Sequence, residues 1–349
     1  MKDTPKIDAT EKDYDAFKTE IGDFLIVRSG TVGTYGIVDV DIPAIFGSYL
    51  IDFRFDMEQV TNEFFGYFYQ SSLFKSQLNK IIQASANTNI NAENIKSTVI
   101  SLPSLNEQRR ISEYLGNLDN LITLHQRKCE QTKKLKKYML QKMFPQNGAK
   151  VPEIRFYGFT YDWEQRKLGE VCSRVQGNDG RMNLPTLTIS AANGWMNQED
   201  RFSGNIAGKE QKNYTLLHKG ELSYNHGNSK LAKYGTVFSL QSYKEALVPR
   251  VYHSFKVEEG SPDFLEYYFA TKLPDRELGK LISSGARMDG LLNIGYNEFM
   301  GIQMLFPSVE EQKQISNYFR NLDTLITLHQ RKCDELKKMK KYMLQNMFI

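Results

Sequence analysis

Cysteine is scarce in this chain, and its scarcity narrows the class of protein. Three cysteines occur among 349 residues, at Cys129, Cys172 and Cys333. An odd, low count without the spacing of a disulfide scaffold indicates a reducing compartment. The sequence also has no apolar run of 18 residues and no signal peptide. We therefore expect a soluble, cytoplasmic protein with no membrane contact.

Recognisable catalytic motifs are missing as well. The sequence contains no P-loop, no Gly-x-Gly-x-x-Gly after a strand, no His-Glu-x-x-His and no Gly-x-Ser-x-Gly. The Asn/Asp-Pro-Pro-Tyr/Phe tetrad of methyltransferases is also absent. The glycines Gly30, Gly33 and Gly36 run into another strand-like segment, which favours a turn over a phosphate-binding loop. We expect a chain that is not an enzyme by itself and that binds no cofactor of its own.

The composition that is present suffices for globular cores. Hydrophobic residues make up 40% and aromatic residues 12% of the chain. The length predicts two or three domains. The net charge of +4 and the isoelectric point of about 8.7 permit nucleic-acid binding without requiring it.

One segment occurs twice, and the rest of the chain is arranged around it. Residues 117–144 and 321–348 are identical at 22 of 28 positions, with an offset of 204. The similarity extends upstream to a Pro-x-x-x-Glu-Gln motif, which begins at Pro103 and at Pro307. The repeat indicates that the chain carries two copies of one supersecondary unit.

Both copies have the heptad spacing of a coiled coil, with apolar residues at most seam positions. Ordinary core helices are the alternative, but core packing alone needs only the apolar pattern and not near-identity. Near-identity favours a shared partner surface or pairing about a pseudo-two-fold axis. The predicted seam comprises Ile111, Leu115, Leu118, Ile122, Ile315, Phe319, Leu322 and Ile326.

The outer faces of the two helices are basic. Together they hold 13 of the 45 lysines and arginines. Such strips suit phosphates or an acidic partner, and a solvated helix face explains them equally well. The first strip is Arg127, Lys128, Lys133, Lys134, Lys136, Lys137 and Lys142, and the second is Arg331, Lys332, Lys337, Lys338, Lys340 and Lys341.

The predicted fold class is α+β, with two mixed α/β domains and two long antiparallel coiled-coil helices. We predict a first, shortened domain at 1–102, a first helix at 103–146, a linker at 147–152, a complete domain at 153–306 and a second helix at 307–349. The two domains match in the turns at Gly22-Asp23 and Gly220-Glu221. About sixty residues, 153–210, have no counterpart in the first domain, and on this pattern we expect that domain to begin inside its globular unit.

Local patterns predict the elements of each domain. In the first, residues 1–20 are expected to be weakly ordered, Ile21–Val40 to form a strand pair, 57–82 a helix and Ser97–Leu102 a strand. In the second, strand-like runs are Pro185–Ser190, Gly220–Tyr224, Gly235–Leu240 and Leu247–Val257, followed by a helix at 262–283 and a strand ending at Phe306.

With these residues in hand, the chain resembles the specificity subunit of type I restriction-modification systems. The resemblance rests on the opener from Arg155-Phe156 through Trp163 to Lys167-Leu168-Gly169, on the Gly-Asp/Glu turns, and on the Pro-x-x-x-Glu-Gln start of each duplicated helix. It covers essentially the whole chain. Each motif is weak alone, but their order and duplication are specific.

The resemblance implies a target-recognition domain for each half of a bipartite DNA site, held apart by the paired helices. It implies two methyltransferase subunits and two motor-nuclease subunits as partners. It also implies that S-adenosylmethionine, ATP and Mg²⁺ belong to those partners, and that this subunit is non-catalytic. Two alternatives stay open: a truncated or phase-variable half-specificity allele that works by dimerisation, and a coiled-coil adaptor that binds only protein.

Candidate DNA contacts are hydrogen-bonding side chains on loops, because base edges and phosphates are read by such groups. Each of them is equally explained as a turn former or a solvated side chain. The loop at 225–230 is favoured, since it joins two strand-like runs and offers amide, imidazole and ammonium donors. The candidates are Arg28, Ser29, Thr34 and Asn89 in the first domain, and Arg174, Asn178, Arg181, Asn193, Trp195, Tyr224, Asn225, His226, Asn228, Lys230, Ser284 and Arg287 in the second.

The helix repeat also carries residue types that bind zinc. His125 and Cys129 lie at i and i+4, and His329 and Cys333 repeat the spacing, so an antiparallel pair would bring two histidines and two cysteines together. A central coiled-coil layer in which histidine fixes the register explains the same residues. We favour that layer and predict no metal.

Overall fold

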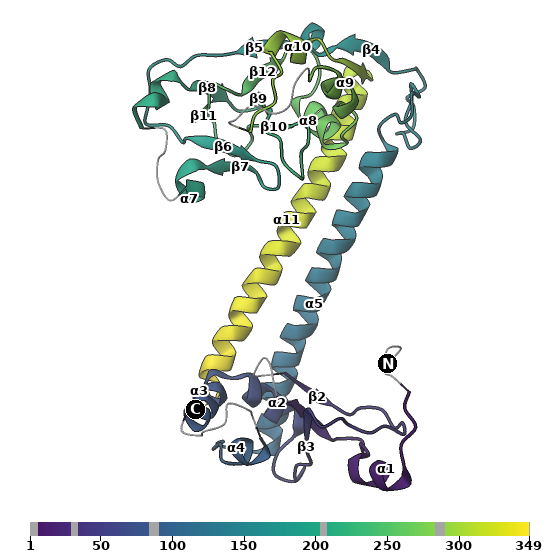
Figure 1. Ribbon diagram of the computed structural model, residues 1–349, viewed down its shortest axis with the longest axis vertical. Coiled ribbons are helices and arrows are strands. Elements are labelled where there is room, and N and C mark those ends of the chain that lie inside the picture. The colour runs from purple at the N-terminus through teal and green to yellow at the C-terminus, as the bar shows by residue number, and fades with distance from the viewer. Residues whose placement is uncertain (1–5, 29–33, 84–90, 203–207, 283–289, 349) are drawn as a thin grey trace. The chain divides into compact units, whose positions relative to one another are not determined.

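The computed structural model describes residues 6–28, 34–83, 91–202, 208–282 and 290–348 (Figure 1). The chain divides into two compact units. Unit 1 comprises Met1–Cys129 with Leu328–Ile349, and unit 2 comprises Glu130–Thr327. Both mix helices with strands, so the predicted α+β class is confirmed. The boundaries predicted for the recognition domains stay a prediction.

Unit 1 is built on a three-stranded antiparallel sheet with the order β2-β1-β3. The strands are β1 (Phe24–Val27), β2 (Tyr35–Ile37) and β3 (Leu50–Phe53). In β1, Phe24 and Ile26 are fully buried, since alternate side chains of a strand face the same side. The strand pair predicted within Ile21–Val40 is therefore confirmed.

The lead-in to this sheet is more ordered than its sequence suggests. Residues 11–17 form α1 (Glu11–Phe17), so the prediction of a weakly ordered segment is wrong for them. The hydroxyl oxygen of Thr10 accepts a hydrogen bond from the Asp13 amide and caps the helix. None of the residues of α1 is buried, which explains why no apolar pattern revealed it.

Two helices stand where one was predicted over residues 57–82. They are α2 (Asn62–Gln70) and α3 (Ser72–Gln83). Ser71 interrupts them in an extended conformation, and its hydroxyl oxygen accepts a hydrogen bond from the Phe74 amide at 3.1 Å. Local capping by serine thus competes with a continuous helix.

The strand predicted at Ser97–Leu102 is wrong. After α4 (Ala92–Lys96), residues 98–104 show no strand pairing to any other described residue. The side chain of Gln77 instead binds the backbone of Val99, with its amide nitrogen 2.8 Å from the carbonyl and its oxygen 2.7 Å from the N–H. A strand needs a partner for its backbone groups, and the described part of unit 1 offers none here.

Unit 2 contains a four-stranded antiparallel sheet, in the order β10-β9-β12-β5, and three two-stranded sheets, β11-β8, β13-β4 and β6-β7. The runs predicted around β6, β9 and β10 are confirmed, whereas Leu247–Val257 spans two separate strands. The bounds are β4 (Glu164–Lys167), β5 (Cys172–Val175), β6 (Leu187–Ser190), β7 (Gly194–Asn197), β8 (Thr215–His218), β9 (Leu222–Asn225), β10 (Thr236–Ser239), β11 (Glu245–Val248), β12 (His253–Val257) and β13 (Gln303–Phe306).

The helix predicted at 262–283 is divided into α8 (Pro262–Ala270) and α9 (Asp275–Lys280), with Pro274 between them. Proline removes a backbone donor and so disfavours a continuous helix. The shorter helices of unit 2 are α6 (Leu168–Val171), α7 (Gln198–Phe202), the 3-10 helix η1 (Gly208–Asn213) and α10 (Tyr296–Met300).

The duplicated segments form α5 (Leu105–Lys142) and α11 (Val309–Asn346), each 38 residues long. Within unit 1, Lys340 Nζ lies 2.7 Å from Asp119 Oδ1. Within unit 2, Lys136 Nζ lies 2.5 Å from Asp323 Oδ1. These two pairs are the same residues in the two copies, exchanged between the helices, so within each unit an aspartate of one long helix is paired with a lysine of the other. Lys136 and Lys340 are thereby engaged, so two members of the basic strips are not free.

A tyrosine completes each of these ion pairs. The Tyr67 hydroxyl donates to Asp119 at 3.1 Å in unit 1, and the Tyr267 hydroxyl donates to Asp323 at 2.7 Å in unit 2. Each lysine also lies over the ring of its tyrosine, at 5.3 Å and 5.0 Å from the centroid. Each lysine–aspartate pair therefore joins the two long helices to each other and contacts α2 in unit 1 or α8 in unit 2.

The predicted seam residues lie mainly on the buried side of the helices. In unit 1, Leu115, Leu118 and Ile122 are buried in one cluster with Cys333 and Leu336. In unit 2, Ile315, Phe319 and Leu322 are buried in another. Ile111 and Ile326 are half-buried.

The glutamine of each Pro-x-x-x-Glu-Gln motif has a structural task. Gln108 Oε1 accepts a hydrogen bond from the Thr61 amide at 2.9 Å, and Gln312 Oε1 accepts one from the Ser261 amide at 3.1 Å. Thr61 and Ser261 are the N-caps of α2 and α8. A buried amide thus joins the start of each long helix to a helix of the globular part, which explains why the motif is duplicated.

Candidate nucleic-acid interface

The predicted contact loop that follows β9 lies beside residues 290–292. The Asn228 amide donates to the Gly290 carbonyl at 3.0 Å, and the Leu292 amide donates to the His226 carbonyl at 2.8 Å. Gly227 and Leu291 form an isolated bridge between these two bonds. The loop that follows β9 is therefore bound to the end of the Gly/Ser-rich loop that precedes α10. The side chains of Asn228 and Lys230 are exposed on it.

Tyr224 and His226 support this loop rather than project from it. Tyr224 is fully buried, its hydroxyl donates to the Tyr234 carbonyl at 2.6 Å, and burial raises its pKa. Both ring nitrogens of His226 face backbone carbonyls, Leu292 O at 2.7 Å and Val251 O at 2.9 Å. Their polar atoms are already engaged, so the structure argues against direct DNA contacts by these two residues.

A second histidine, which the sequence did not single out, lies behind the loop. The ring of His253 stacks on His226 with centroids 4.9 Å apart, and its Nε2 lies 2.8 Å from the Ile294 carbonyl. Burial lowers the pKa of His253 to about 4, so the ring is neutral at pH 7. The two stacked rings support the loop from its buried side.

Arg174 is the predicted contact on β5, and its side chain is exposed. Its guanidinium lies over the ring of Tyr296, 4.4 Å from the centroid. A stacked guanidinium keeps its N–H groups available for phosphate or a base edge while its orientation is held. Arg174 therefore retains the chemistry required of a contact.

Arg181 and Asn178 are committed to local structure. Arg181 donates to both carboxylate oxygens of Glu245, at 2.8 Å and 2.9 Å, and to Asp179 at 2.7 Å. These hydrogen bonds hold the pKa of both carboxyl groups below the usual range. Asn178 donates to the carbonyls of Arg181 and Gln211. Both residues shape a loop whose positive charge is neutralised.

Asn225 is likewise turned inward, since its side-chain amide donates to Ile189 O at 3.2 Å and accepts from the Gly227 amide at 3.0 Å. Asn193 is exposed at the turn between β6 and β7. Trp195 on β7 is half-buried, and its Nε1 donates to the Ser239 carbonyl at 3.0 Å. Of these three, Asn193 is the exposed one, and its Nδ2 lies 3.9 Å from Met196 Sδ.

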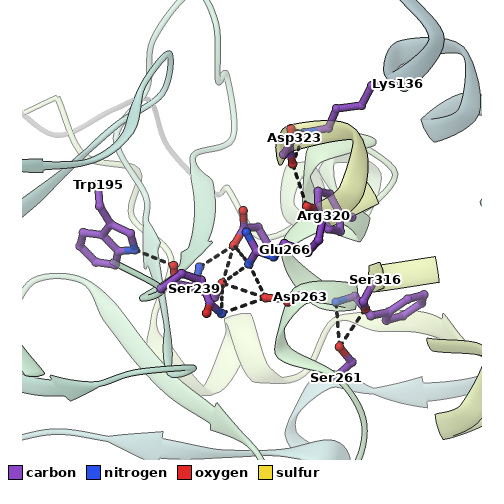
Figure 2. A network of polar contacts seen from close by, with 12 residues as sticks. Lys136, Trp195, Ser239, Ser261, Asp263, Glu266, Ser316, Arg320 and Asp323 are labelled. Carbon is purple, nitrogen blue, oxygen red and sulfur yellow. Dashed lines mark hydrogen bonds and ion pairs between the residues drawn. The ribbon is translucent and has the colours of Figure 1, made fainter. Parts of the chain in front are cut away.

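Figure 2 shows that Trp195 belongs to a polar network reaching α8 and α11. The Ser239 hydroxyl donates to Glu266 Oε2 at 2.5 Å, and the guanidinium of Arg320 binds Asp263 and the Ser239 hydroxyl. Burial raises the pKa of Glu266, and the hydrogen bond from Ser239 and the charge of Arg320 oppose that rise. One arginine of the long helix thus holds the strand end beside Trp195.

Lys233 is a candidate that sequence reasoning missed. Its side chain is exposed, and its Nζ lies 5.2 Å from the centroid of Tyr234. Within the described ranges of the chain, neither Lys230 nor Lys233 has an ion-pair partner, whereas many other surface cations of unit 2 do. The sequence could have indicated this candidate, because Lys233 is the second lysine in the short segment from Ser229 to Lys233 that continues the favoured loop.

The remaining predicted residues belong to unit 1 or to ranges that the structure does not describe. In unit 1, Arg28 and Thr34 are exposed, and Arg28 donates to the Ser48 carbonyl at 3.3 Å. Four candidates lie outside the described residues: Ser29, Asn89, Ser284 and Arg287. The contact predictions for individual residues thus stay predictions, with Arg174, Asn193, Asn228 and Lys230 the best exposed in unit 2.

The two histidines of the helix repeat meet each other. His125 Nδ1 and His329 Nδ1 lie 3.0 Å apart, which is a hydrogen-bond distance. No group of three or more potential ligands gathers there or elsewhere among the described residues. Of the helices that are described, none combines the length and apolarity needed to cross a membrane.

Comparison with known proteins identifies several similar sequences. Residues 4–134 match the family described as type I restriction modification DNA specificity domain. The specificity subunit of the type I restriction enzyme MjaVIII of Methanocaldococcus jannaschii is 32% identical over 102 residues, which are 29% of this chain and 24% of that protein. The putative MjaX specificity subunit of the same organism is 24% identical over 293 residues, 79% of this chain and 63% of that protein. The chain thus spans less than two thirds of either relative.

A solved structure has a similar fold. The crystal structure of the S subunit of a type I restriction-modification system from M. genitalium superposes with a TM-score of 0.58 at 14% identity, covering 96% of this chain and 85% of that one. At this identity the likeness concerns the fold alone.

Proposed function

We propose that the chain is a specificity subunit of a type I restriction-modification system and that it recognises a DNA sequence on behalf of such a complex, which the match of residues 4–134 to that family's specificity domain and the similar specificity subunits support. The observation that carries the proposal for unit 2 is the loop at residues 225–235, which hydrogen bonds from its buried side hold in place. It presents Asn228, Lys230 and Lys233 at the surface, next to a chain segment that ends the Gly/Ser-rich loop. Lysines position a protein on phosphates, and amides read base edges.

The buried side of this loop supports the same role. Contacts that discriminate between bases require side chains held in place by their neighbours. Tyr224, His226 and His253 supply that support through hydrogen bonds to backbone carbonyls. The exposed residues can therefore vary while the loop keeps its conformation.

The proposal is tested by DNA binding of the chain assembled with its methyltransferase subunits. We expect Lys230→Ala combined with Lys233→Ala to weaken binding and to reduce the slope of log K against log salt by about 1 for each phosphate that is no longer neutralised. Lys313→Ala, an exposed lysine on α11, is the matched control and should leave the slope unchanged. Equal slopes for the double variant and the control would contradict the assignment of this loop.

The long helices support the partner half of the proposal. Each carries a row of exposed apolar residues, and the two rows match position by position. The exposed fractions lie between 43% and 62% for Leu121, Leu124, Leu135 and Tyr138 on α5 and for Leu325, Leu328, Met339 and Tyr342 on α11. Apolar surface repeated on two near-identical helices suits two copies of one partner. We take that partner to be the methyltransferase subunit, with the motor-nuclease subunits joining the complex.

In this proposal the chain is non-catalytic, and S-adenosylmethionine, ATP and Mg²⁺ act on the partners. A bipartite target, with one half read by each unit, is the expected arrangement, and a cytoplasmic location is expected with it. An adaptor that binds only protein is the competing function. The absence of DNA binding by the assembled complex would favour the adaptor.

A further inference from the structure

One side chain joins the candidate contact loop of unit 2 to a neighbouring hairpin. Asn225 is the last residue of β9 and the first of the loop at residues 225–235. Its Nδ2 donates to the Ile189 carbonyl on β6 at 3.2 Å, and its Oδ1 accepts from the Gly227 amide at 3.0 Å. Asn225 thus connects the backbone of the loop with the backbone of the β6–β7 hairpin, whose turn carries the exposed Asn193.

The other strand of this hairpin is fixed as well. Trp195 on β7 donates from Nε1 to the Ser239 carbonyl at 3.0 Å. The Ser239 amide and hydroxyl in turn donate to Glu266 Oε2 at 2.9 Å and 2.5 Å (Figure 2). Ile189 and Trp195 are cross-strand partners in the register of the hairpin. Both attachments therefore act on one residue pair, and a single further pair separates it from the turn.

The hairpin has other supports at Ile189 besides Asn225. The Ile189 carbonyl also accepts a hydrogen bond from Arg201 at 3.3 Å, and its amide donates to the Tyr252 hydroxyl at 3.3 Å. The Ile189 side chain is buried in a cluster with Leu187 and Tyr252. Without the Asn225 amide, the carbonyl keeps a donor and the apolar packing is unchanged, so the stability of unit 2 should change little. The lost feature is the fixed distance between hairpin and loop.

The loop itself is closed by its own backbone. The amides of Ser229 and Ala232 each donate to the carbonyl of the other residue at 3.1 Å, which forms a tight turn with Lys230 inside it. At the far end, Gly235 has a φ of +81°, and a Cβ there would lie 2.5 Å from the Asn225 carbonyl oxygen. The loop therefore keeps its conformation by itself, and Asn225 relates it to the hairpin.

We propose that Asn225 is a positioning residue for DNA recognition by unit 2. It holds the turn with Asn193 against the loop with Asn228 and Lys230, so that both contact one half-site as a single surface. The inference rests on the proposed function. Amides discriminate between bases only when they are placed to within about 0.5 Å, whereas lysine contacts to phosphate tolerate more displacement. Loss of the Asn225 amide should therefore reduce sequence preference and leave non-specific affinity unchanged.

The test uses the chain assembled with its methyltransferase subunits. Binding to the DNA motif found by methylation mapping is compared with binding to DNA of unrelated sequence. Asn225→Asp keeps the shape of the side chain, but a carboxylate oxygen replaces the donor to the Ile189 carbonyl. We expect Asn225→Ala and Asn225→Asp to lower the ratio of specific to non-specific affinity roughly tenfold or more. With Asn225→Ala, non-specific affinity and its salt slope should equal those of the wild type.

Asn213→Asp is the matched control. It introduces the same charge into unit 2 at an exposed asparagine, whose amide donates to Glu210 at 2.7 Å. This variant should keep the wild-type ratio of specific to non-specific affinity.

Protonation gives a readout that a merely structural role would not move. In Asn225→Asp, protonation of the new carboxyl group restores a donor to the Ile189 carbonyl. The specificity ratio of this variant should therefore rise as the pH falls from about 8 to about 5, since a half-buried carboxyl group beside a carbonyl oxygen takes up its proton early. The ratio of Asn225→Ala should show no such rise. Chemical denaturation followed by tryptophan fluorescence should give equal midpoints for Asn225→Ala and the wild type.

Any of four results would overturn the inference. They are an unchanged specificity ratio in both Asn225 variants, an equal fall in Asn213→Asp, identical pH profiles for the two Asn225 variants, or a parallel loss of specific and non-specific affinity with a lower denaturation midpoint. A wild-type complex that prefers no DNA sequence would contradict the proposed function and this inference with it. A wild-type preference that survives in both Asn225 variants would contradict the inference alone.

Discussion

At the scale of single residues, the two copies of the long helix diverge where their surroundings diverge. Arg320 in α11 corresponds to Gly116 in α5. Arg320 binds Asp263 and the Ser239 hydroxyl, which holds the strand end beside Trp195. Among its described residues, unit 1 has no counterpart of the β6-β7 sheet. The first copy therefore needs no arginine at this position.

We predict that Arg320→Ala lowers the free energy of unfolding of unit 2 by about 2 kcal/mol or more, because two carboxylates lose their cation in a partly buried site. Both tryptophans, Trp163 and Trp195, lie in unit 2, so their fluorescence during chemical denaturation reports on this unit alone. Lys280→Ala is the control in the same unit. Lys280 is 60% exposed and its ion pair with Glu277 is worth less than about 1 kcal/mol. Equal losses for the two variants would rule out a special role for Arg320.

At the scale of elements, partners decide which segments become strands. Gln303–Phe306 and residues 99–102 occupy the same place in the repeat, yet one is a strand and the other is not. β13 has β4 beside it, whereas the described part of unit 1 offers no such neighbour. The long helices form in both copies, because their neighbours are the same in both. Each contacts the other long helix, and α5 contacts α2 as α11 contacts α8.

The matched apolar rows on these helices give a stoichiometric prediction. On the proposed stoichiometry of two methyltransferase subunits for each chain, Leu124→Lys or Leu328→Lys alone should leave one co-purifying subunit, and the two together should leave none. A lysine placed in an apolar interface loses its hydration without gaining a partner. Mass measurement of the purified complex gives the count.

The control for that experiment is Thr123→Lys with Thr327→Lys. These residues are also exposed and also related by the offset of 204, but each is one position away around its helix. Retention of both methyltransferase subunits by the leucine variants would show that the rows are not the docking surface.

At the scale of the whole molecule, the two units are unequal. Both have an antiparallel sheet, a helix after it, and a glutamine of the long helix that binds the N-cap residue of that helix. The strands β4 to β8 and β11 have no counterpart among the described residues of unit 1. Of the exposed candidate contacts of unit 2, Arg174 and Asn193 lie in or beside those extra strands, whereas the loop at residues 225–235 joins β9 and β10. Recognition by the two units is therefore expected to differ in extent.

Methylation mapping in cells that express the chain with its methyltransferase subunit tests this difference. We expect a bipartite motif in which substitutions at Arg174 and Asn228 alter one half only, because both residues belong to unit 2. Substitution of Lys313 should leave both halves intact. A symmetric motif would instead indicate a dimer of half-specificity chains, and simultaneous changes in both halves would contradict the assignment of one half to each unit.

The sequence by itself determined the duplication, the two long helices and the α+β class, because periodic apolar patterns and near-identity are properties of the chain and need no coordinates. It also supplied the candidate loops. Tertiary structure alone decided which loop residues face outward: His226 and Tyr224 have the polar groups of contact residues, but the backbone carbonyls they bind come from residues 234, 251 and 292. It likewise decided that residues 99–102 are not a strand, since pairing depends on a neighbour distant in sequence.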